Sequence, residues 1–331
     1  MNHSKLYRWG LLGLLIVLFS MALLGCGNQP QDSVDPVPEE NMQEPVTEAE
    51  QGKYPLTFTD GSGQEVTIPE EPKTIITTVP SNTEMIFALG GGDRLIGVSD
   101  YCNFPAEVDQ IEKIGAMEMN VEKILSLQPD LIFITPYQNA NAGEALEQFK
   151  SLGMSVVVIQ DATSFEDVYG SMRLIAKVID AEDKAEEIIT EMKDRLAWFK
   201  DKAENITEKK KIWVEVSPAP EIYSTGKGTF MHEMLEVINA VNAVGDQEGW
   251  IKFTEEEIVQ LNPDVIITTY GFYVDKPSEE VLKRAGWGEV PAVKNKQVFD
   301  VDNDTVTRPG PRLIDGVETL AKLIYPEVFK Q

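Results

Sequence analysis

The chain has 331 residues, in which 29 lysines and arginines face 55 aspartates and glutamates, giving a formal net charge of −26. An acidic chain of this kind repels nucleic acid phosphates and anionic lipid surfaces, which argues against polyanion binding. Two cysteines and two histidines are too few for a disulfide framework, a histidine-rich metal site or an ordinary Ser-His-Asp hydrolase.

The first 25 residues are typical of a signal peptide. Lys5 and Arg8 precede the apolar run LLGLLIVLFSMALLG, which is shorter than the ~20 residues that cross a bilayer. The run ends at Cys26, and LLGC resembles a bacterial lipobox, in which the cysteine receives lipid. We therefore expect residues 1–25 to be removed and Cys26 to anchor the mature chain to a membrane.

Residues 26–53 follow as a predicted flexible tether. They are rich in proline and acidic side chains and hold almost nothing apolar, so they cannot offset their ordering entropy. Once Cys26 is lipidated, only Cys102 remains, and no internal disulfide can form. We expect Cys102 to be a buried structural thiol.

The alternation of strand and helix patterns over residues 54–181 predicts a first α/β lobe. The stretch YPLTFTDGSGQEVTIPEEP alternates apolar and polar residues about a glycine-rich turn, as a β-hairpin does. Strand and helix units follow, and Ser81 or Asn82 is a candidate cap for the first helix, with Glu84 in its first turn. The near-continuous apolar strands LIFIT and SVVVI are typical of a parallel sheet covered on both faces.

From residue 165 onward, the sequence pattern predicts two helices and then a second lobe. Apolar residues fall at helical spacing over 165–179 and 183–205, and the second helix, about 35 Å long, is the expected interdomain helix within 182–206. Residues 207–331 restart the strand and helix scheme with KIWVEVSP. The chain is long enough for two α/β lobes, each with its own core, and small ligands tend to bind in a cleft between lobes.

One phrase occurs in both lobes. Between residues 122–136 and 256–270, seven of fifteen positions are identical, where composition alone gives roughly one. Asn120 and Thr254 are the expected helix caps, so Glu122 and Glu256 become the second residues of equivalent helices. A carboxylate there complements the helix dipole, but a matched pair also suits a two-fold partner with basic pockets. A weaker similarity, which we call the echo between the lobes, relates EMIFALGGGDRLIGV to EMLEVINAVNAVG.

A set of aromatic and charged side chains on loops marks a candidate cleft. Arg308, in DNDTVTRPGPR beside Asp304, is a candidate clamp for an anionic or amide group, whereas Arg312 is expected to pair with a structural acid. The aromatic residues of the predicted loops suggest a flat, partly apolar ligand. They are Tyr101, Tyr137, Tyr223, Trp250, Phe272 and Tyr273.

The sequence resembles the substrate-binding lipoproteins of ABC importers for iron chelates and vitamin B12, from Ile75 to Pro326. The residues that carry the resemblance are VPSNTEMIFALG, GVSDYCNFP, NVEKILSLQPDLI, YSTGKGTF, EEEIVQLNPDVI and TRPGPRLIDGVETLA. The resemblance implies two α/β lobes linked by one rigid helix, with the ligand between them. It also implies that Glu122 and Glu256 dock into arginine pockets of a permease dimer, which a cytoplasmic ATPase drives.

The pattern is most similar to the cobalamin-binding branch of that family, whose cleft residues match Tyr101, Tyr223, Trp250, Asp304 and Arg308. One departure is that the region of Ala116 and Met117 stands where that branch has a tryptophan. A ferric siderophore or haem therefore remains an alternative ligand.

The resemblance further implies a monomer that binds a small metal chelate, needs no cofactor or metal of its own and catalyses no reaction. We expect it on the outer face of a bacterial cell membrane, of Gram-positive type, held by the lipid on Cys26. The rival classes are a surface-anchored enzyme of chelatase type, which needs a general base or a metal-bound water, and an adhesin without a small ligand.

Overall fold

The computed structural model describes residues 52–329. The predictions for the signal peptide 1–25, for Cys26 and for most of the tether lie outside these residues. Within 52–329, each helix is either too short or too polar to cross a membrane.

The amino-terminal lobe is built on a five-stranded parallel sheet with the order β5-β4-β3-β6-β7. An antiparallel hairpin, β1 (Leu56–Thr59) and β2 (Glu65–Ile68), precedes it at the expected place. In chain order the sheet strands are β3 (Ile75–Thr77), β4 (Leu95–Val98), β5 (Glu112–Lys113), β6 (Leu131–Ile134) and β7 (Ser155–Val158).

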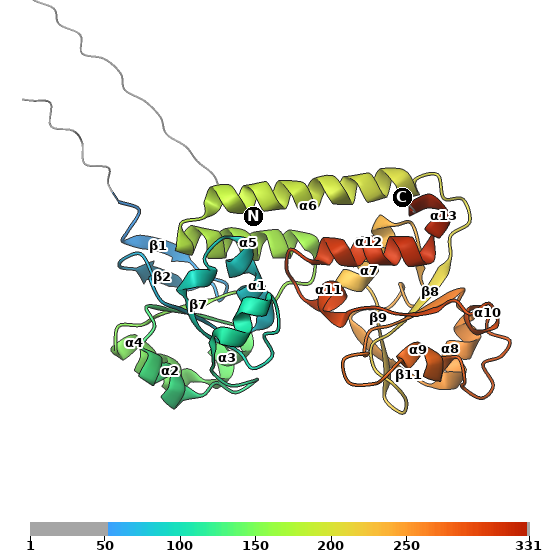
Figure 1. Ribbon diagram of the computed structural model, residues 1–331, viewed down its shortest axis with the longest axis horizontal. Helices are drawn as coiled ribbons and strands as arrows, with labels where there is room; N and C mark the ends of the chain where they lie inside the picture. Colours follow the sequence, from blue (N-terminus) through green and yellow to red (C-terminus); the bar gives the residue numbers. More distant parts are fainter. Residues whose placement is uncertain (1–51, 330–331) are drawn as a thin grey trace, which may run out of the picture. The chain divides into compact units, whose positions relative to one another are not determined.

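Helices connect the strands of this sheet (Figure 1). Because the connected strands are parallel, each crossover must return across a face of the sheet. The connecting helices are α1 (Pro80–Ala88), α2 (Val121–Leu127), α3 (Pro136–Asn141) and α4 (Gly143–Ser151), and α5 (Phe165–Ile179) follows the last strand.

The carboxy-terminal lobe has a four-stranded parallel sheet with the order β10-β8-β12-β13, and a separate antiparallel pair of β9 with β11. Its strands are β8 (Lys211–Glu215), β9 (Ile222–Thr225), β10 (Val241–Asn242), β11 (Trp250–Phe253), β12 (Val265–Thr268) and β13 (Val298–Asp300). Its helices are α7 (Phe230–Val237), α8 (Glu255–Leu261), α9 (Pro277–Val281), α10 (Pro291–Lys294), α11 (Asn303–Thr307), α12 (Leu313–Ile324) and α13 (Pro326–Phe329).

One helix connects the lobes. Helix α6 (Glu182–Ala203) has 22 residues and is therefore about 33 Å long. It packs against α5 of the first lobe and against α7, α12 and α13 of the second, and Figure 1 shows it running along both. Arg195 on α6 also forms ion pairs with Asp315 and Glu318 on α12.

The strands distribute their side chains between two kinds of core. On β6, Leu131 and Phe133 enter a cluster that continues through α5, α6 and α12 into the second lobe. Ile132 and Ile134 point to the opposite face, into a cluster confined to the first lobe. Trp213 and Ile266 belong to a corresponding hydrophobic cluster that is confined to the second lobe.

The predicted fold class, two α/β lobes with parallel sheets joined by a long helix, is confirmed. The expectation of a separate core for each lobe is incomplete, because the lobes also share the cluster beside α6. The predicted cap of the first helix is wrong: α1 begins at Pro80, and its N-cap residue is Val79, which offers no capping side chain. Glu84 consequently lies beyond the first turn of α1 and is buried.

Candidate ligand-binding site

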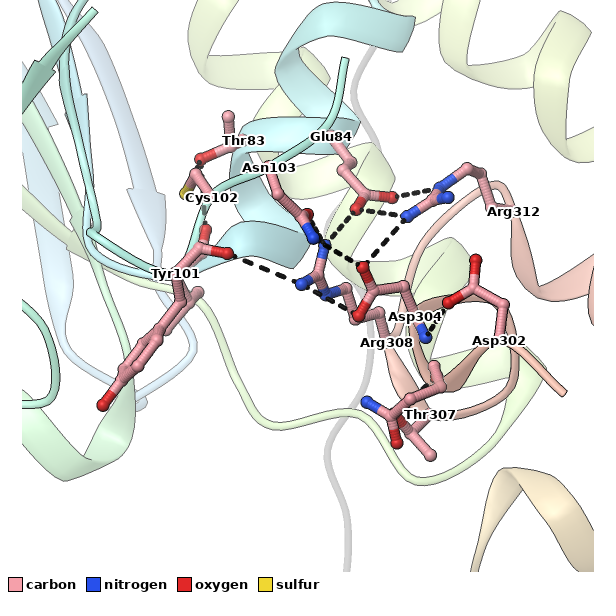
Figure 2. Close-up of polar contacts among 12 residues, drawn as sticks. Thr83, Glu84, Tyr101, Cys102, Asn103, Asp302, Asp304, Thr307, Arg308 and Arg312 are labelled. Atoms are coloured by element: carbon pink, nitrogen blue, oxygen red, sulfur yellow. Dashed lines mark hydrogen bonds and ion pairs between the residues drawn. The ribbon is translucent and has the colours of Figure 1, made fainter. Parts of the chain in front are cut away.

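A cluster of ion pairs joins α1 of the first lobe to the segment 302–312 of the second. Glu84 lies at its centre, where Oε1 accepts a hydrogen bond from Nη1 of Arg308 at 2.9 Å. Arg312 donates to the same carboxylate from Nε and from Nη2, each at 2.9 Å. Figure 2 shows the two guanidinium groups converging on Glu84.

Asn103 extends this cluster toward α11. Its Nδ2 donates to Asp304 Oδ2 at 2.9 Å, and its Oδ1 accepts from Arg308 Nη1 at 2.6 Å. Arg308 also forms an ion pair with Asp304 at 2.9 Å, one helical turn away. We name Glu84, Asn103, Asp304, Arg308 and Arg312 the interlobe cluster.

The charged side chains of the interlobe cluster are largely withdrawn from water, whereas Asn103 is exposed. The side chain of Glu84 is 2% exposed, and those of Arg308 and Arg312 are 16% and 19% exposed. Burial alone would lower the pKa of Arg312, but the hydrogen bonds and charge of Glu84 outweigh it and raise that pKa. The guanidinium of Arg312 also stacks 4.0 Å from the ring centroid of Phe104, a cation–π contact.

Two of the predicted aromatic residues lie on the antiparallel pair β9 and β11. Tyr223 is paired with Lys252, and Trp250 with Thr225, so these side chains share one face of the pair. On the opposite face, Ile222 and Phe253 pack into the hydrophobic cluster that is confined to the second lobe. Trp250 is therefore left 61% exposed at the start of β11.

The structure brings some of the predicted ligand residues together. Asp304 and Arg308 form an ion pair, and the backbone carbonyl of Tyr101 accepts from Arg308 Nη2 at 3.5 Å. The phenol of Tyr101 points away from the interlobe cluster and is exposed (Figure 2). Trp250 lines a pocket of about 140 Å³ together with Thr307 of α11. Tyr223, half-buried on β9, has no side-chain hydrogen bond to these residues within 52–329.

Three further predicted aromatic residues follow strand ends and are exposed. Phe272 and Tyr273, which follow β12, have ring centroids 4.7 Å apart and are more than half exposed. Tyr137 at the start of α3 is also exposed. Loops after strand ends are where an α/β sheet binds ligands, but Tyr137 lines the hollow at the start of α2 and not the pocket at Trp250.

The two repeated glutamates occupy equivalent exposed positions. Glu122 and Glu256 are the second residues of α2 and α8, and Asn120 and Thr254 cap these helices as predicted. Neither glutamate has an ion-pair partner within residues 52–329. Surface hollows of about 940 and 950 Å³ adjoin the starts of α2 and α8, and Figure 1 places both helices on the side away from α6.

The sequence pattern missed Glu84 and Asn103 as members of the site. It did predict that Arg312 pairs with a structural acid, and that acid is Glu84. The faint echo between the lobes could have identified Glu84, because the echo aligns it with Glu233. Glu233 also crosses between the lobes, where its Oε2 accepts from the backbone N–H of Phe165 at 2.9 Å.

Cys102 precedes Asn103 of the interlobe cluster in the chain. Cys102 is buried, as predicted, and burial raises the pKa of its thiol, which keeps it protonated and poorly nucleophilic. Among residues 52–329, no group of three or more His, Cys, Asp and Glu side chains is placed to hold a metal ion.

Two parallel-sheet lobes, bridged by one helix and bearing aromatic and polar side chains between them, define a two-lobed solute-binding protein. The chain belongs to the periplasmic binding protein family, whose model matches residues 75–305. This is a family of transport binding proteins and not of enzymes.

Individual relatives agree with this assignment. An ABC transporter substrate-binding lipoprotein of Bacillus subtilis, YvrC, is 46% identical over 96% of this chain and 97% of its own. The vitamin B12-binding protein of Vibrio parahaemolyticus is 26% identical over 76% of this chain and 90% of its own. A solved structure from Staphylococcus epidermidis, described as a possible iron-binding, periplasmic solute-binding protein, is 35% identical with a TM-score of 0.69, covering 77% of this chain and all of that one.

Proposed function

We propose that the protein is a lipid-anchored receptor that captures a corrinoid such as cobalamin and delivers it to an ABC permease driven by a cytoplasmic ATPase. Its ligand would be held by Tyr101, Tyr223, Trp250, Asp304 and Arg308, and Cys26 would carry the lipid. The observation that carries the proposal is the exposure of Tyr101 and Trp250, one from each lobe, around the partly buried Arg308 and Asp304.

The chemistry of these side chains fits a corrinoid. Exposed aromatic rings offer flat apolar contact to a macrocycle, while Asp304 and Arg308 offer an acceptor and donors to its amide substituents. The relatives named as vitamin B12-binding proteins support this ligand.

A ferric siderophore is the second candidate ligand. The relative described as a possible iron-binding protein has a higher identity, 35%, than the vitamin B12-binding relatives.

A ligand screen on the soluble chain from residue 27 onward distinguishes the two candidate ligands, the corrinoid and the ferric siderophore. A cognate ligand at 100 times its dissociation constant should add about 2.7 kcal/mol to the unfolding free energy and raise the melting temperature. We expect this shift with cobalamin and not with ferric siderophores or haem. A shift with a ferric siderophore alone would replace the corrinoid by the second candidate.

We further propose that Glu122 and Glu256 dock the loaded protein on the permease. Their supporting observation is their exposure at equivalent helix starts without an ion-pair partner in the described part of the chain. Basic pockets on a two-fold partner would complement such a pair.

The double variant Glu122→Arg with Glu256→Arg tests this docking. We expect uptake to fall to background while ligand affinity stays within about twofold of the parent, because neither side chain lies in the interlobe cluster. The control with the same charge change is Glu187→Arg with Glu191→Arg on the exposed side of α6, which should leave uptake unchanged. Reduced ligand affinity in the first double variant would instead place the glutamates in the ligand site.

A further inference from the structure

The start of α1 leaves a buried polar group without a partner. Asn82 is 2% exposed, and its side-chain Nδ2 has no hydrogen-bond partner within residues 52–329. A buried donor left unpaired costs about 1 to 3 kcal/mol. The start of α1 also has no capping side chain. The amide of Asn82 and the first backbone N–H groups of this helix are therefore available to bind a partner.

Asn82 lines a small pocket between the lobes. The pocket has a volume of about 80 Å³, and Ser81, Thr135 and Asp161 of the first lobe contribute to its wall. Pro309 of the second lobe, the residue after Arg308, also lines it. At ~30 Å³ per liquid water molecule, the pocket has room for two to three waters or a small polar substituent.

The electrostatic character of this pocket selects against an anion. Among residues 52–329, Asp161 is the only charged residue that lines it, and Asp161 is exposed. A carboxylate in the pocket would meet the charge of Asp161 without a cation on the pocket wall to offset it. A neutral group that both accepts and donates hydrogen bonds has complementary partners in Asn82 and Asp161.

A neighbouring pocket at the start of α7 has a different lining. Extending the echo between the lobes by two residues toward the N-terminus aligns Met231 with Asn82. Met231 lines the pocket of about 140 Å³ with Phe230, Trp250 and Val306, with threonines between them. The two pockets share Ala162 and Pro309 as lining residues. The equivalent positions of the two lobes therefore present an amide on one side and large apolar side chains on the other.

We propose that the pocket at Asn82 binds a primary carboxamide of the ligand, with the carbonyl oxygen accepting from Asn82 Nδ2 and the amide nitrogen donating to Asp161. This inference rests on the proposed capture of a chelate and specifies its class as amide-bearing. A corrin rim carries such carboxamides, whereas the peripheral acids of haem are carboxylates.

Calorimetric titration of cyanocobalamin into the soluble chain from residue 27 tests the inference. We expect Asn82→Leu to weaken binding about tenfold, the value of one or two lost hydrogen bonds. Asn139→Leu, at an exposed asparagine of α3, is the matched control and should bind as the parent does.

A second measurement does not depend on a buried substitution. Cobalamin derivatives in which one rim amide is hydrolysed to a carboxylate are titrated against the parent and against Asp161→Asn, an exposed position. We expect one derivative to bind the parent at least tenfold more weakly than cobalamin does, and Asp161→Asn to restore most of that loss. This measurement decides the matter if Asn82→Leu fails to fold.

The outcomes separate the two proposals. Parent-like affinity in a folded Asn82→Leu protein, or equal binding of all hydrolysed derivatives, would overturn the carboxamide pocket and leave corrinoid capture intact. If the parent binds a ferric siderophore or haem and not cobalamin, corrinoid capture fails and the carboxamide inference fails with it.

Discussion

At the scale of single residues, the two aspartates of the repeated phrase have equivalent structural roles. Asp130 Oδ2 accepts hydrogen bonds from the backbone N–H groups of Lys73 and Thr74, at 2.8 and 2.9 Å, just before β3. Asp264 Oδ2 accepts from the backbone N–H of Lys211 at 2.8 Å, at the start of β8. Each aspartate therefore fixes the start of the strand that neighbours the aspartate's own strand in the sheet. This is a role that the packing of each lobe requires. Glu122 and Glu256 make no comparable side-chain hydrogen bond within residues 52–329.

Asp130→Asn should make the protein less stable in a way that depends on pH. Burial alone would raise the pKa of Asp130, but the hydrogen bonds from Lys73 and Thr74 lower it. A lowered pKa gives stability that is present above the unfolded value of ~3.9 and is lost as the pH falls through the folded value. Because the side chain is exposed, we expect a loss of only about 1 kcal/mol at pH 7.

Urea unfolding of the parent and Asp130→Asn at neutral and at acidic pH measures this effect. The difference in unfolding free energy should shrink as the pH falls below the unfolded value of ~3.9 and through the lowered pKa of the folded protein, because the parent carboxylate then becomes protonated too. Asp194→Asn, at an exposed position of α6, is the control and should match the parent at both pH values. A constant difference across the range would show that the charge of Asp130 is not responsible.

At the scale of elements, the close packing of α11 on α12 depends on a glycine. A Cβ at Gly316 of α12 would lie 2.3 Å from the carbonyl oxygen of Thr305 in α11. Real Cβ atoms do not approach that closely, so Gly316→Ala must push the helices apart. Because Asp304 lies on α11 beside Thr305, the displacement would also disturb the candidate ligand site.

Gly316→Ala should therefore lower the unfolding free energy by about 2 kcal/mol, as overpacking does, and weaken ligand binding as well. The matched control is Gly170→Ala in α5, where a Cβ would meet no atom within 4 Å. That control should gain about 0.5 to 1 kcal/mol, because alanine restricts the unfolded chain. Denaturant unfolding and calorimetry measure both; equal stabilisation by the two substitutions would contradict the packing argument.

Elements with a long apolar pattern could be predicted from the sequence, and short ones could not. Helix α5 has the predicted bounds, and α6 lies close to its predicted range, because fifteen or more residues reveal a helical period. Helix α11 has five residues, too few to show a period, and depends on the cap from Asp302 and on packing against α12. The two-residue edge strands β5 and β10 form for similar tertiary reasons.

At the scale of the whole molecule, the candidate site is harder to predict than the fold. Arg308 was predicted as a ligand clamp from its own loop, but its partner Glu84 lies 224 residues away in the chain. No local pattern can pair residues at such a separation. Loop aromatics such as Phe272, which follows β12, were predictable because their exposure follows from where strands end, whereas the burial of Glu84 depends on both lobes at once.

The lobes are held together by the shared core and by the interlobe cluster, and Glu84→Gln separates the two contributions. The substitution removes the charge that neutralises Arg308 and Arg312, leaving only Asp304 as a carboxylate partner in the cluster. Breaking a buried pair from one side costs about 3 to 5 kcal/mol, and we expect the lower end because Asp304 compensates in part. The shared core stays intact, so the protein should remain folded while exchange of backbone amides in α1 and α11 accelerates.

Urea unfolding and hydrogen exchange by mass spectrometry measure these two effects. Arg195→Gln is the control, since it removes a more exposed contact between α6 and α12 and should cost at most about 1 kcal/mol. If Glu84→Gln costs no more than this control, the interlobe cluster does not hold the lobes and the shared core beside α6 alone sets their arrangement. If exchange rises throughout the protein instead of in α1 and α11, Glu84 stabilises the fold in general and not the junction between the lobes.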